Sequence, residues 1–363
     1  MTFWFILQVI HAWVKCGSDN GLEKAIHILD LMNEQKFNDV ENLKAISKCY
    51  VAILDGWCKS KNPGSVEAAT EVLNDLVTLP FSQAETRHFN LVMNSWAERK
   101  GENSTQYVYN LLDDMILLCQ KGNTRVKPNT GTYNILLKSI IQSKRRNYLY
   151  EADSLLREME ASLSNDGDSI VATPDRISYT TVLLGWAKSK HSKAIEKATN
   201  ILSRMERQAK LGYSLSVKPD TMTYNILLNA LASIQKKDSA EQCVKILFKM
   251  EKLHEFGDRN VKPDVISYNT VLNAYAKSTR RRASQKALSL LNHMEICHQS
   301  NPFKAKPDII TYNSVLSTVS RSKNQSAPFK AEEILNDLEK KYLSGQSDVK
   351  PDLYTYNIVM SSW

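Results

Sequence analysis

Asparagine or threonine recurs directly after an aromatic residue at six nearly evenly spaced positions. These positions are Asn134, Thr180, Asn225, Asn269, Asn313 and Asn357, and consecutive members are 46, 45, 44, 44 and 44 residues apart. Five residues before each of them, an Asp or Asn follows a Pro, as in KPDTMTYNILL and KPDVISYNTVL. Amide, hydroxyl and carboxylate groups form hydrogen bonds. The pattern therefore predicts one hydrogen-bonding site per repeat, and we call the six residues anchors.

The sequence contains no pattern typical of an enzyme. We find no Ser/His/Asp signature, no phosphate-binding glycine loop and no paired metal-ligand motif. His293 and His298 flank Cys297, but a spacing of five residues places the two histidines on different faces of a helix. We therefore expect no catalysis, no metal, no other cofactor and no small-molecule substrate.

The elements that must position the anchors repeat with them. Three weaker anchors lie upstream at Leu7, Val51 and Asn90. A Met or Leu follows each anchor except Asn357 by 25 residues, and only the segment after it varies in length, from 14 to 21 residues. These second landmarks are Met32, Leu76, Met115, Met159, Met205, Met250, Met294 and Leu338. Each unit is thus predicted to be a rigid block joined to the next by a connector of variable length.

Each block reads as two amphipathic helices. Apolar residues recur at helical spacing on both sides of polar turns such as IQKKDS. Pro263 disfavours helix at Lys262 and is compatible with the first turn of the following helix. Because neither helix can bury its apolar face alone, the pairs must stack. We predict an all-α fold, an α-solenoid with superhelical stacking, formed by a single array of about eight repeats over residues 1–363 and truncated at its C-terminal end.

The overall composition agrees with this interpretation. No stretch is apolar enough to span a membrane, and the N-terminus lacks the basic residues and cleavage site of a signal peptide. Six scattered cysteines without a CxxC pair favour a reducing compartment. The net charge of +8 suits an anionic partner, although many proteins that bind no nucleic acid are equally basic.

At these residues the chain resembles the pentatricopeptide repeat family, whose units combine TYN, an apolar helix, a turn, an amphipathic helix ending in Met, and KPD. The resemblance covers essentially the whole chain and is looser in the first three units. It implies binding of single-stranded RNA, one base per repeat, by two or three side chains. It also implies a mitochondrial or chloroplast protein that acts in RNA processing, stability, editing or translation, with protein effectors as possible further partners. The units here are longer than is usual in the family.

In that family each base is read by the anchor together with the last residue of the unit. Four pairs resemble the combination that prefers uracil: Asn134 with Asp175, Asn225 with Asp264, Asn269 with Asp308, and Asn313 with Asp352. Thr180 with Asp220 resembles a guanine-preferring pair and Asn90 with Asn129 a pyrimidine pair, while Asn357 begins a further unit. The resemblance predicts the order pyrimidine-U-G-U-U-U, read 5′ to 3′ from the N-terminus. Leu7 with Ile46 and Val51 with Glu85 match no such pair.

The resemblance implies two further groups of RNA contacts. Apolar residues three positions before the anchors would hold the bases between them: Ile177, Met222, Ile266 and Ile310. Gly131 and Arg87 occupy this position in two other units, where we expect a weaker grip. Basic residues eight positions after the anchors could bind phosphates: Lys15, Lys59, Lys188, Lys277 and Arg321. A cation near a helix C-terminus is also favoured by the helix dipole alone.

Two alternatives remain open on the sequence. The anchor asparagines could simply cap helices, since Asn is favoured near helix starts. The chain could also be a protein-binding scaffold of the tetratricopeptide type. The recurrent Pro-Asp partner favours base reading, because capping by Asn does not require it. The recurrent tyrosine before the anchor is predicted to pack in the core.

Overall fold

The computed structural model describes most of the chain. It describes all residues except 1, 17–18, 35–39, 61, 80–81, 100, 102, 165–170, 213–216, 235–237, 279–281, 302–304 and 323, and it leaves out a few further side chains, including that of the Leu7 anchor. Within the described ranges the secondary structure is helical, with no strand. The predicted all-α class is therefore confirmed.

The helices alternate as the first and second members of hairpins. In unit-by-unit order they are α1 (Thr2–Cys16), α2 (Asp19–Glu34), α3 (Val40–Lys59), α4 (Ser65–Thr78), α5 (Thr86–Glu98), α6 (Ser104–Gln120), α7 (Thr130–Ser143), α8 (Tyr148–Ala161), α9 (Arg176–Lys188), α10 (Ala194–Leu211), α11 (Thr221–Ser233), α12 (Ser239–Glu255), α13 (Val265–Lys277), α14 (Ala283–Ser300), α15 (Ile309–Ser320), α16 (Ala327–Leu343) and α17 (Leu353–Ser362). Two short 3₁₀ helices, η1 (Thr124–Val126) and η2 (Ser162–Ser164), follow α6 and α8.

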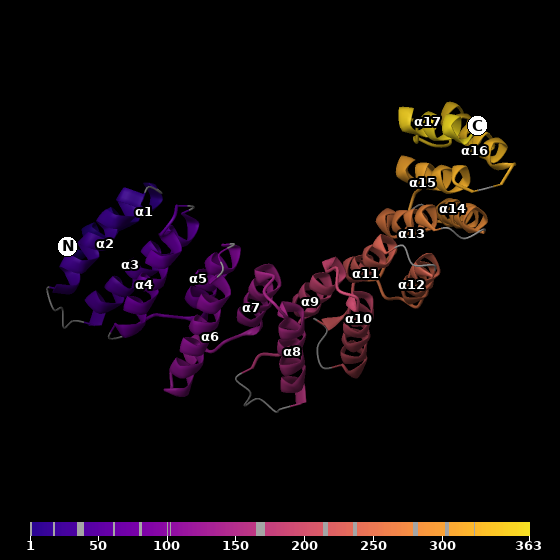
Figure 1. Ribbon diagram of the computed structural model, residues 1–363. Coiled ribbons are helices and arrows are strands. Elements are labelled where there is room, and N and C mark those ends of the chain that lie inside the picture. The colour runs from indigo at the N-terminus through magenta and orange to yellow at the C-terminus, as the bar shows by residue number, and fades with distance from the viewer. Residues whose placement is uncertain are drawn as a thin grey trace. The chain divides into compact units, whose positions relative to one another are not determined.

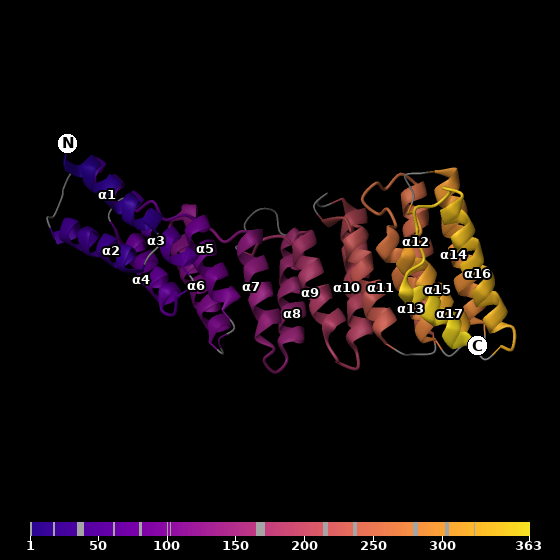
Figure 2. The ribbon, with the colours of Figure 1, turned by 90° about the horizontal axis from the view of Figure 1, so that it is seen from above.

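The contacts divide the chain into two compact units, Met1–Val182 and Leu183–Trp363, with the boundary inside α9. Within each unit the first helices form a row: α1, α3, α5 and α7 contact their neighbours in the first unit, as do α11, α13, α15 and α17 in the second. The second helices α2, α4, α6, α12, α14 and α16 each pack on their own partner and on the first helix that follows (Figure 1). Figure 2 shows the hairpins of each unit side by side in chain order. Each unit is thus an α-solenoid; the single continuous array stays a prediction.

The core is made of the residues that define the repeat. The landmark residues Met115, Met159, Met205, Met250 and Met294 are all buried, as are Tyr133, Tyr179, Tyr224, Tyr268 and Tyr312 of the first helices. The prediction that the recurrent tyrosine packs in the core is confirmed. The largest fully buried side chain is that of Trp186 in α9. Because every hairpin buries the same positions against its neighbours, stacking provides the core that a single hairpin lacks.

Most first helices begin with a capping box. The side chain of Asp220, Asp264, Asp308 or Asp352 accepts a hydrogen bond from the backbone three residues on, and a Thr or Ser there bonds back. Asn129 makes the same arrangement for α7. Pro263 therefore lies just outside α13, before its capping residue Asp264, and the prediction that it could occupy the first turn of that helix is wrong. Proline ends the connector, and the aspartate begins the helix.

The connectors are anchored at their last residues. Val126, Val217 and Val261 are buried, just before the Lys-Pro step. The first residue of the preceding first helix holds the same segment by its hydroxyl. Thr221 Oγ1 donates to the carbonyl oxygens of Asn260 and Lys262 at 3.2 and 2.7 Å, and Thr86 does the same at Arg125 and Lys127. The differences in connector length therefore lie upstream of these held residues.

A tyrosine network ties neighbouring hairpins together through their second helices. The hydroxyl of Tyr224 donates to Glu206 Oε1 at 2.7 Å, and Lys249 bonds both oxygens of the same carboxylate at 2.6 Å. In the next repeats Glu251 joins Tyr268 to His293, and Glu295 joins Tyr312 to Lys341. Each glutamate follows a landmark methionine directly, a recurrence that sequence analysis missed.

The sequence predicted reduced cysteines and no membrane span. Cys49, Cys58, Cys119, Cys243 and Cys297 are free thiols, whereas the side chain of Cys16 lies outside the described residues. Burial raises the pKa of Cys49 to about 11 and that of Cys243 to about 12, which keeps both protonated near neutral pH. Among the described helices, none has the length and apolar character needed to cross a bilayer.

Candidate functional site

Each of the six anchors, like Asn90, is the fifth residue of its first helix. Asn225, for example, lies one turn beyond the capping residue Asp220, and it is buried rather than positioned at the helix start. The alternative in which the anchor asparagine caps its helix is therefore wrong, because the aspartate five residues earlier does so. The anchor amide is left to contact the next repeat.

The capping residue of the next repeat bonds the anchor. Asn225 Nδ2 donates to Asp264 Oδ1 at 3.1 Å, and Asn269 Nδ2 donates to Asp308 Oδ1 at 3.0 Å. Asn134 makes the same bond to Asp175 at 3.1 Å. The bonds from Asn313 to Asp352 and from Asn90 to Asn129 are longer, at 3.4 Å. Five of the six residue pairs inferred from sequence are thus brought into direct contact, each across two repeats.

A third group, missed by sequence analysis, completes this arrangement. In four repeats the hydroxyl of the Ser or Thr two residues before the next anchor lies against the amide oxygen. Ser267 Oγ is 2.7 Å from Asn225 Oδ1, and Thr311 Oγ1 is 2.7 Å from Asn269 Oδ1. Thr132 and Ser178 stand in the same relation to Asn90 and Asn134, at 2.7 and 2.6 Å. The signal was present in the sequence as an invariable Thr or Ser two positions before each of the six anchors. We call the anchor, the capping residue and this hydroxyl the amide network.

The two residues of the sixth pair, Thr180 and Asp220, lie in different compact units of the chain. Thr180 lies in the first unit, and its hydroxyl donates to the carbonyl oxygen of Arg176 at 2.8 Å. Asp220 lies in the second unit, where it caps α11. The guanine-preferring pair therefore stays a prediction. Asn357 is exposed in α17.

The apolar residues predicted to hold bases are exposed, unlike most large apolar side chains of the repeats. The exposed fractions are 59% for Ile177, 65% for Met222, 59% for Ile266 and 58% for Ile310. Each lies three residues before its anchor and so on the same side of the helix, one turn earlier. Arg87 at this position is ion-paired with Glu85 at 3.0 Å. These side chains give the anchor rows an exposed apolar border.

The charge around the amide network is set by its hydrogen bonds. The pKa of Asp352 is lowered, first by the hydroxyl of Thr355 and then by its backbone amide, so this carboxyl is ionised at neutral pH. An ionised carboxylate accepts hydrogen bonds and cannot donate them. It must therefore face the amide nitrogen of its partner rather than the oxygen.

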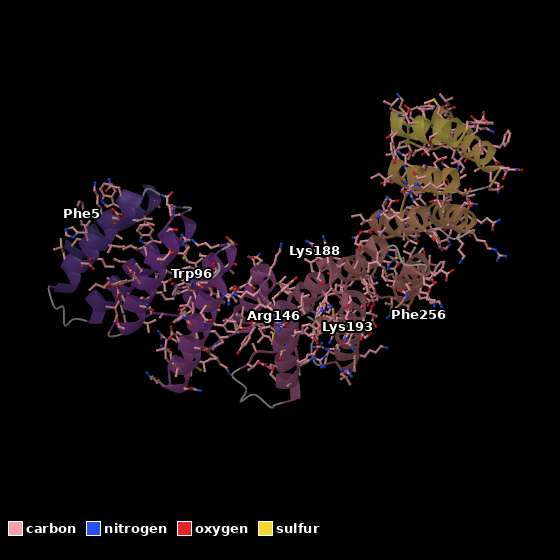
Figure 3. The ribbon with its side chains drawn as sticks, in the orientation of Figure 1. Phe5, Trp96, Arg146, Lys188, Lys193 and Phe256 are labelled. Atoms are coloured by element: carbon pink, nitrogen blue, oxygen red, sulfur yellow. The ribbon has the colours of Figure 1, made fainter. Side chains whose placement is uncertain are left out.

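The predicted phosphate-binding residues lie at the ends of first helices. Lys59, Lys188 and Lys277 are the last residues of α3, α9 and α13, and Arg321 follows α15. Lys188 and Lys277 are exposed, and Figure 3 labels Lys188. Lys59 forms an ion pair with Asp55, and Arg321 donates to the carbonyl oxygen of Ala276 at 3.2 Å. These ends suit both the phosphate interpretation and a favourable interaction with the helix dipole.

The third anchor-bearing helix, α5, departs from this charge pattern. Glu98 occupies the position of the basic residues, and Lys138 of the next first helix pairs with it at 3.3 Å. Lys138 also donates to Asn94 at 3.1 Å. The carboxylate is thereby neutralised locally, so α5 contributes no basic end to a phosphate row.

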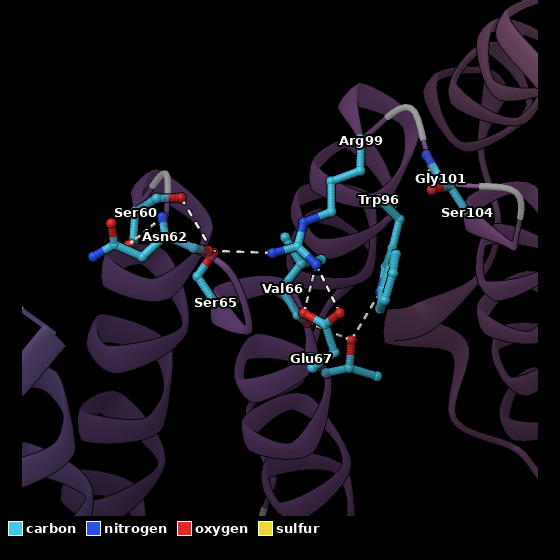
Figure 4. Close-up of polar contacts among 10 residues, drawn as sticks. Ser60, Asn62, Ser65, Val66, Glu67, Trp96, Arg99, Gly101 and Ser104 are labelled. Atoms are coloured by element: carbon cyan, nitrogen blue, oxygen red, sulfur yellow. Dashed lines mark hydrogen bonds and ion pairs between the residues drawn. The ribbon is translucent and has the colours of Figure 1, made fainter.

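A separate polar cluster lies near the turn ends of α4 and α5. Arg99 bonds both carboxylate oxygens of Glu67, and Trp96 Nε1 donates to Thr70 at 2.9 Å (Figure 4). Trp96 also stacks on Tyr107, with ring centroids 4.0 Å apart. A cavity of about 490 Å³ opens beside these residues. The cluster lies at the opposite end of α5 from Asn90, and its polar groups satisfy one another, which indicates a structural tie.

His293, one of the two histidines near Cys297, contacts a glutamate of the preceding repeat. His293 Nε2 lies 2.9 Å from Glu251 and so belongs to the tyrosine network. Within the part of the chain that the structure describes, no group of three or more His, Cys, Asp or Glu side chains is arranged to hold a metal ion.

No curated protein sequence matches the chain. The crystal structure of the pentatricopeptide repeat protein PPR10 in complex with an 18-nt psaJ RNA element is similar at 18% identity and a TM-score of 0.47, over 99% of this chain and 47% of that one. PPR10 from maize is similar at 16% identity and a TM-score of 0.32, over 99% of this chain and 61% of that one. The chain thus spans about half the length of these proteins.

The last repeats of the chain match a known family profile. Residues 251–298 and 295–363 match the profile of the pentatricopeptide repeat domain. The unit matched there carries the capping aspartate, the hydroxyl and the anchor asparagine of the amide network. The same combination, with the same contacts, occurs upstream at Asn134, Asp175 and Ser178. Residues 251–363 therefore match the pentatricopeptide repeat family, and the repeats before them carry the same residues in the same contacts.

Proposed function

We propose that the protein binds single-stranded RNA and reads one base at each anchor. The observation that supports this most directly is the amide network. The amides of Asn90, Asn134, Asn225 and Asn269 are each held in one orientation by the next repeat, and one N–H and one oxygen lone pair remain for a ligand. A base edge with one acceptor beside one donor, such as O4 and N3–H of uracil, complements this pair.

The exposed apolar residues support base binding as well. Ile266 and Ile310 lie one turn before Asn269 and Asn313 and are mostly exposed. A base between two such side chains would bury apolar surface on both faces, as stacking sites for single-stranded RNA do. The recognition sequence we propose is pyrimidine-U-G-U-U-U, from Asn90 to Asn313.

Binding, rather than chemistry, is the proposed role. The family suggests action in a mitochondrion or chloroplast, on processing, stability, editing or translation of a transcript, with protein effectors as possible partners. A peptide-binding scaffold is the competing function, but it would have no need of a carboxylate–amide pair in successive repeats. The two differ in salt dependence, since binding through phosphates weakens as salt rises.

Selection from random RNA tests the proposal. The unchanged protein should select U opposite Asn269, and Asn269→Thr, which copies the Thr180 anchor, should shift that single position towards G. Asn225 provides the matched control, because its base should stay U in the same experiment. A selected motif that is the same for both proteins contradicts base reading by the anchors.

A further inference from the structure

We propose that the Ser or Thr hydroxyl of the amide network is a positioning residue for base recognition, which fixes the amide of the anchor in the preceding repeat. This inference rests on the proposed function and adds a third side chain to each pair. It applies to Thr132, Ser178, Ser267 and Thr311, whose hydroxyl oxygens lie 2.6–2.7 Å from the anchor oxygens.

The bonds around Thr311 show which way its proton points. Thr311 Oγ1 accepts from the backbone N–H of Asp308 at 3.0 Å, and it lies 2.7 Å from Asn269 Oδ1 and 2.8 Å from Asp308 Oδ1. The Asp308 oxygen already accepts from the Thr311 backbone and from Asn269 Nδ2. The Asn269 oxygen is the acceptor with capacity to spare, so the hydroxyl donates to it.

The amide is then held from both ends. Its nitrogen faces a carboxylate that can only accept, and its oxygen faces a hydroxyl that donates. A 180° rotation of the amide would set oxygen against oxygen on the carboxylate side. The two bonds also use one N–H and one lone pair, which leaves a single donor beside a single acceptor. Removing the hydroxyl leaves the orientation to the carboxylate alone and leaves the amide oxygen without its bond.

The chain contains a natural comparison in Asn313. Its bond to Asp352 is longer, at 3.4 Å, and its Oδ1 is buried with no hydrogen-bond partner among the described residues. The equivalent hydroxyl, of Thr355, lies 2.7 Å from Asp352 Oδ1 instead. Asn269 and Asn313 thus share the same three residue types, but only Asn269 has a hydroxyl on its oxygen. We therefore expect sharper discrimination between U and C at Asn269 than at Asn313.

The test uses the full chain and RNAs that differ only in the base opposite one anchor. Thr311→Val removes the hydroxyl with little change in shape. We expect the preference for U over C opposite Asn269 to fall about 3- to 10-fold, the range for one neutral hydrogen bond. Thr311→Ser should restore it, since Ser fills this role at Ser267. Thr355→Val is the matched control, because it breaks the same type of capping box and should leave the preference opposite Asn313 within about 2-fold.

Each result decides the inference. Undiminished preference for U in Thr311→Val overturns the positioning role and leaves the proposed function standing. No base preference in the unchanged protein overturns the proposed function and this inference with it. If Thr311→Val loses helical circular dichroism, Ser267→Ala provides the same measurement opposite Asn225 with a smaller change. A loss of affinity for all bases equally, without a change in the U-to-C ratio, indicates a structural role only and also overturns the inference.

Discussion

The amide network and the tyrosine network both tie each repeat to the next, but they differ in what they leave unused. In the tyrosine network the Glu206 carboxylate accepts from both Tyr224 and Lys249 and lies mostly out of solvent. In the amide network Asn269 uses one N–H and one lone pair and keeps one of each. In the proposed function, this spare hydrogen-bonding capacity, rather than recurrence, is what distinguishes the amide network from a structural tie.

The largest expected effect is the loss of folding stability when alkaline pH ionises the buried tyrosines. Burial, followed by the bonded glutamate, raises the pKa of Tyr224, Tyr268 and Tyr312, and burial followed by Glu158 raises that of Tyr133, a core tyrosine outside this network, to about 12. The unfolded tyrosines lose their protons near pH 10, so the unfolded state binds fewer protons above that pH. The stabilisation is complete below about pH 10 and is lost as pH rises towards 12. Tyr133 alone contributes about 3 kcal/mol to this change.

Circular dichroism across pH 8 to 12 measures this loss. The midpoint should move to lower pH when urea is added, because stability is then smaller at every pH. Helical signal that is unchanged at pH 12 would show that the tyrosines are not held protonated by the fold.

Two substitutions of Tyr224 distinguish the contribution of its buried ring from that of its hydrogen bond. Tyr224→Ala should cost about 3–5 kcal/mol, since it removes a buried aromatic ring. Tyr224→Phe keeps the ring and should cost about 1 kcal/mol, because Lys249 still partners Glu206. Urea unfolding of the second unit's helices, followed by hydrogen exchange, gives both values. Neither the hydroxyl nor Glu206 touches the anchor, so Tyr224→Phe should leave the base opposite Asn225 unchanged; a changed base would join the two networks.

Asp308 caps α15 and, in the proposed function, positions the amide of Asn269 for base recognition. Its substitution should therefore affect both stability and base preference, by smaller amounts. Asp308→Ala removes a helix cap, at about 1 kcal/mol, and also the acceptor for Asn269. Asp308→Asn keeps the cap, as Asn129 does for α7. We expect the Asn variant to keep its stability and to relax from U towards either pyrimidine, while the Ala variant loses base preference. Thermal unfolding and binding to single-base RNA variants measure the two effects separately. Equal base preference in all three proteins would remove Asp308 from recognition.

Much of the fold was predictable because the same sequence pattern occurs in several repeats. The buried landmarks, the buried tyrosines and the position of each hairpin follow from periodicity, which averages out the noise of any one segment. The role of Pro263 was not, since a proline before a cap and a proline in a first turn look alike in sequence. The division into two units inside α9 left no mark in the repeat, because the spacing there is nearly unchanged.

The candidate site was predicted in its residues but not in its bonds. The pairing of Asn with Asp came from the family resemblance, and the contacts agree with it in five pairs. The hydroxyl of Thr311 was visible as a recurring letter, yet only coordinates show that it reaches an amide 42 residues earlier. Likewise, the glutamate after each methionine looked like a charged surface residue until its bond to a tyrosine was seen. Contacts across repeats depend on stacking, which no single helix encodes.

The anchored connectors set a limit on what chain length can change. The hydroxyl of Thr221 donates to the carbonyl groups of Asn260 and Lys262. Gly257, in the turn after α12, has a left-handed backbone conformation. Residues added between Gly257 and Asn260 would bulge into solvent without moving the hairpin that follows. The distance between successive anchors is then set by how closely the helices pack, and not by the length of the connector. Repeats with long and short connectors would therefore present their anchors at the same spacing. Such loops would be permissive places for a fluorescent tag or a tethered effector.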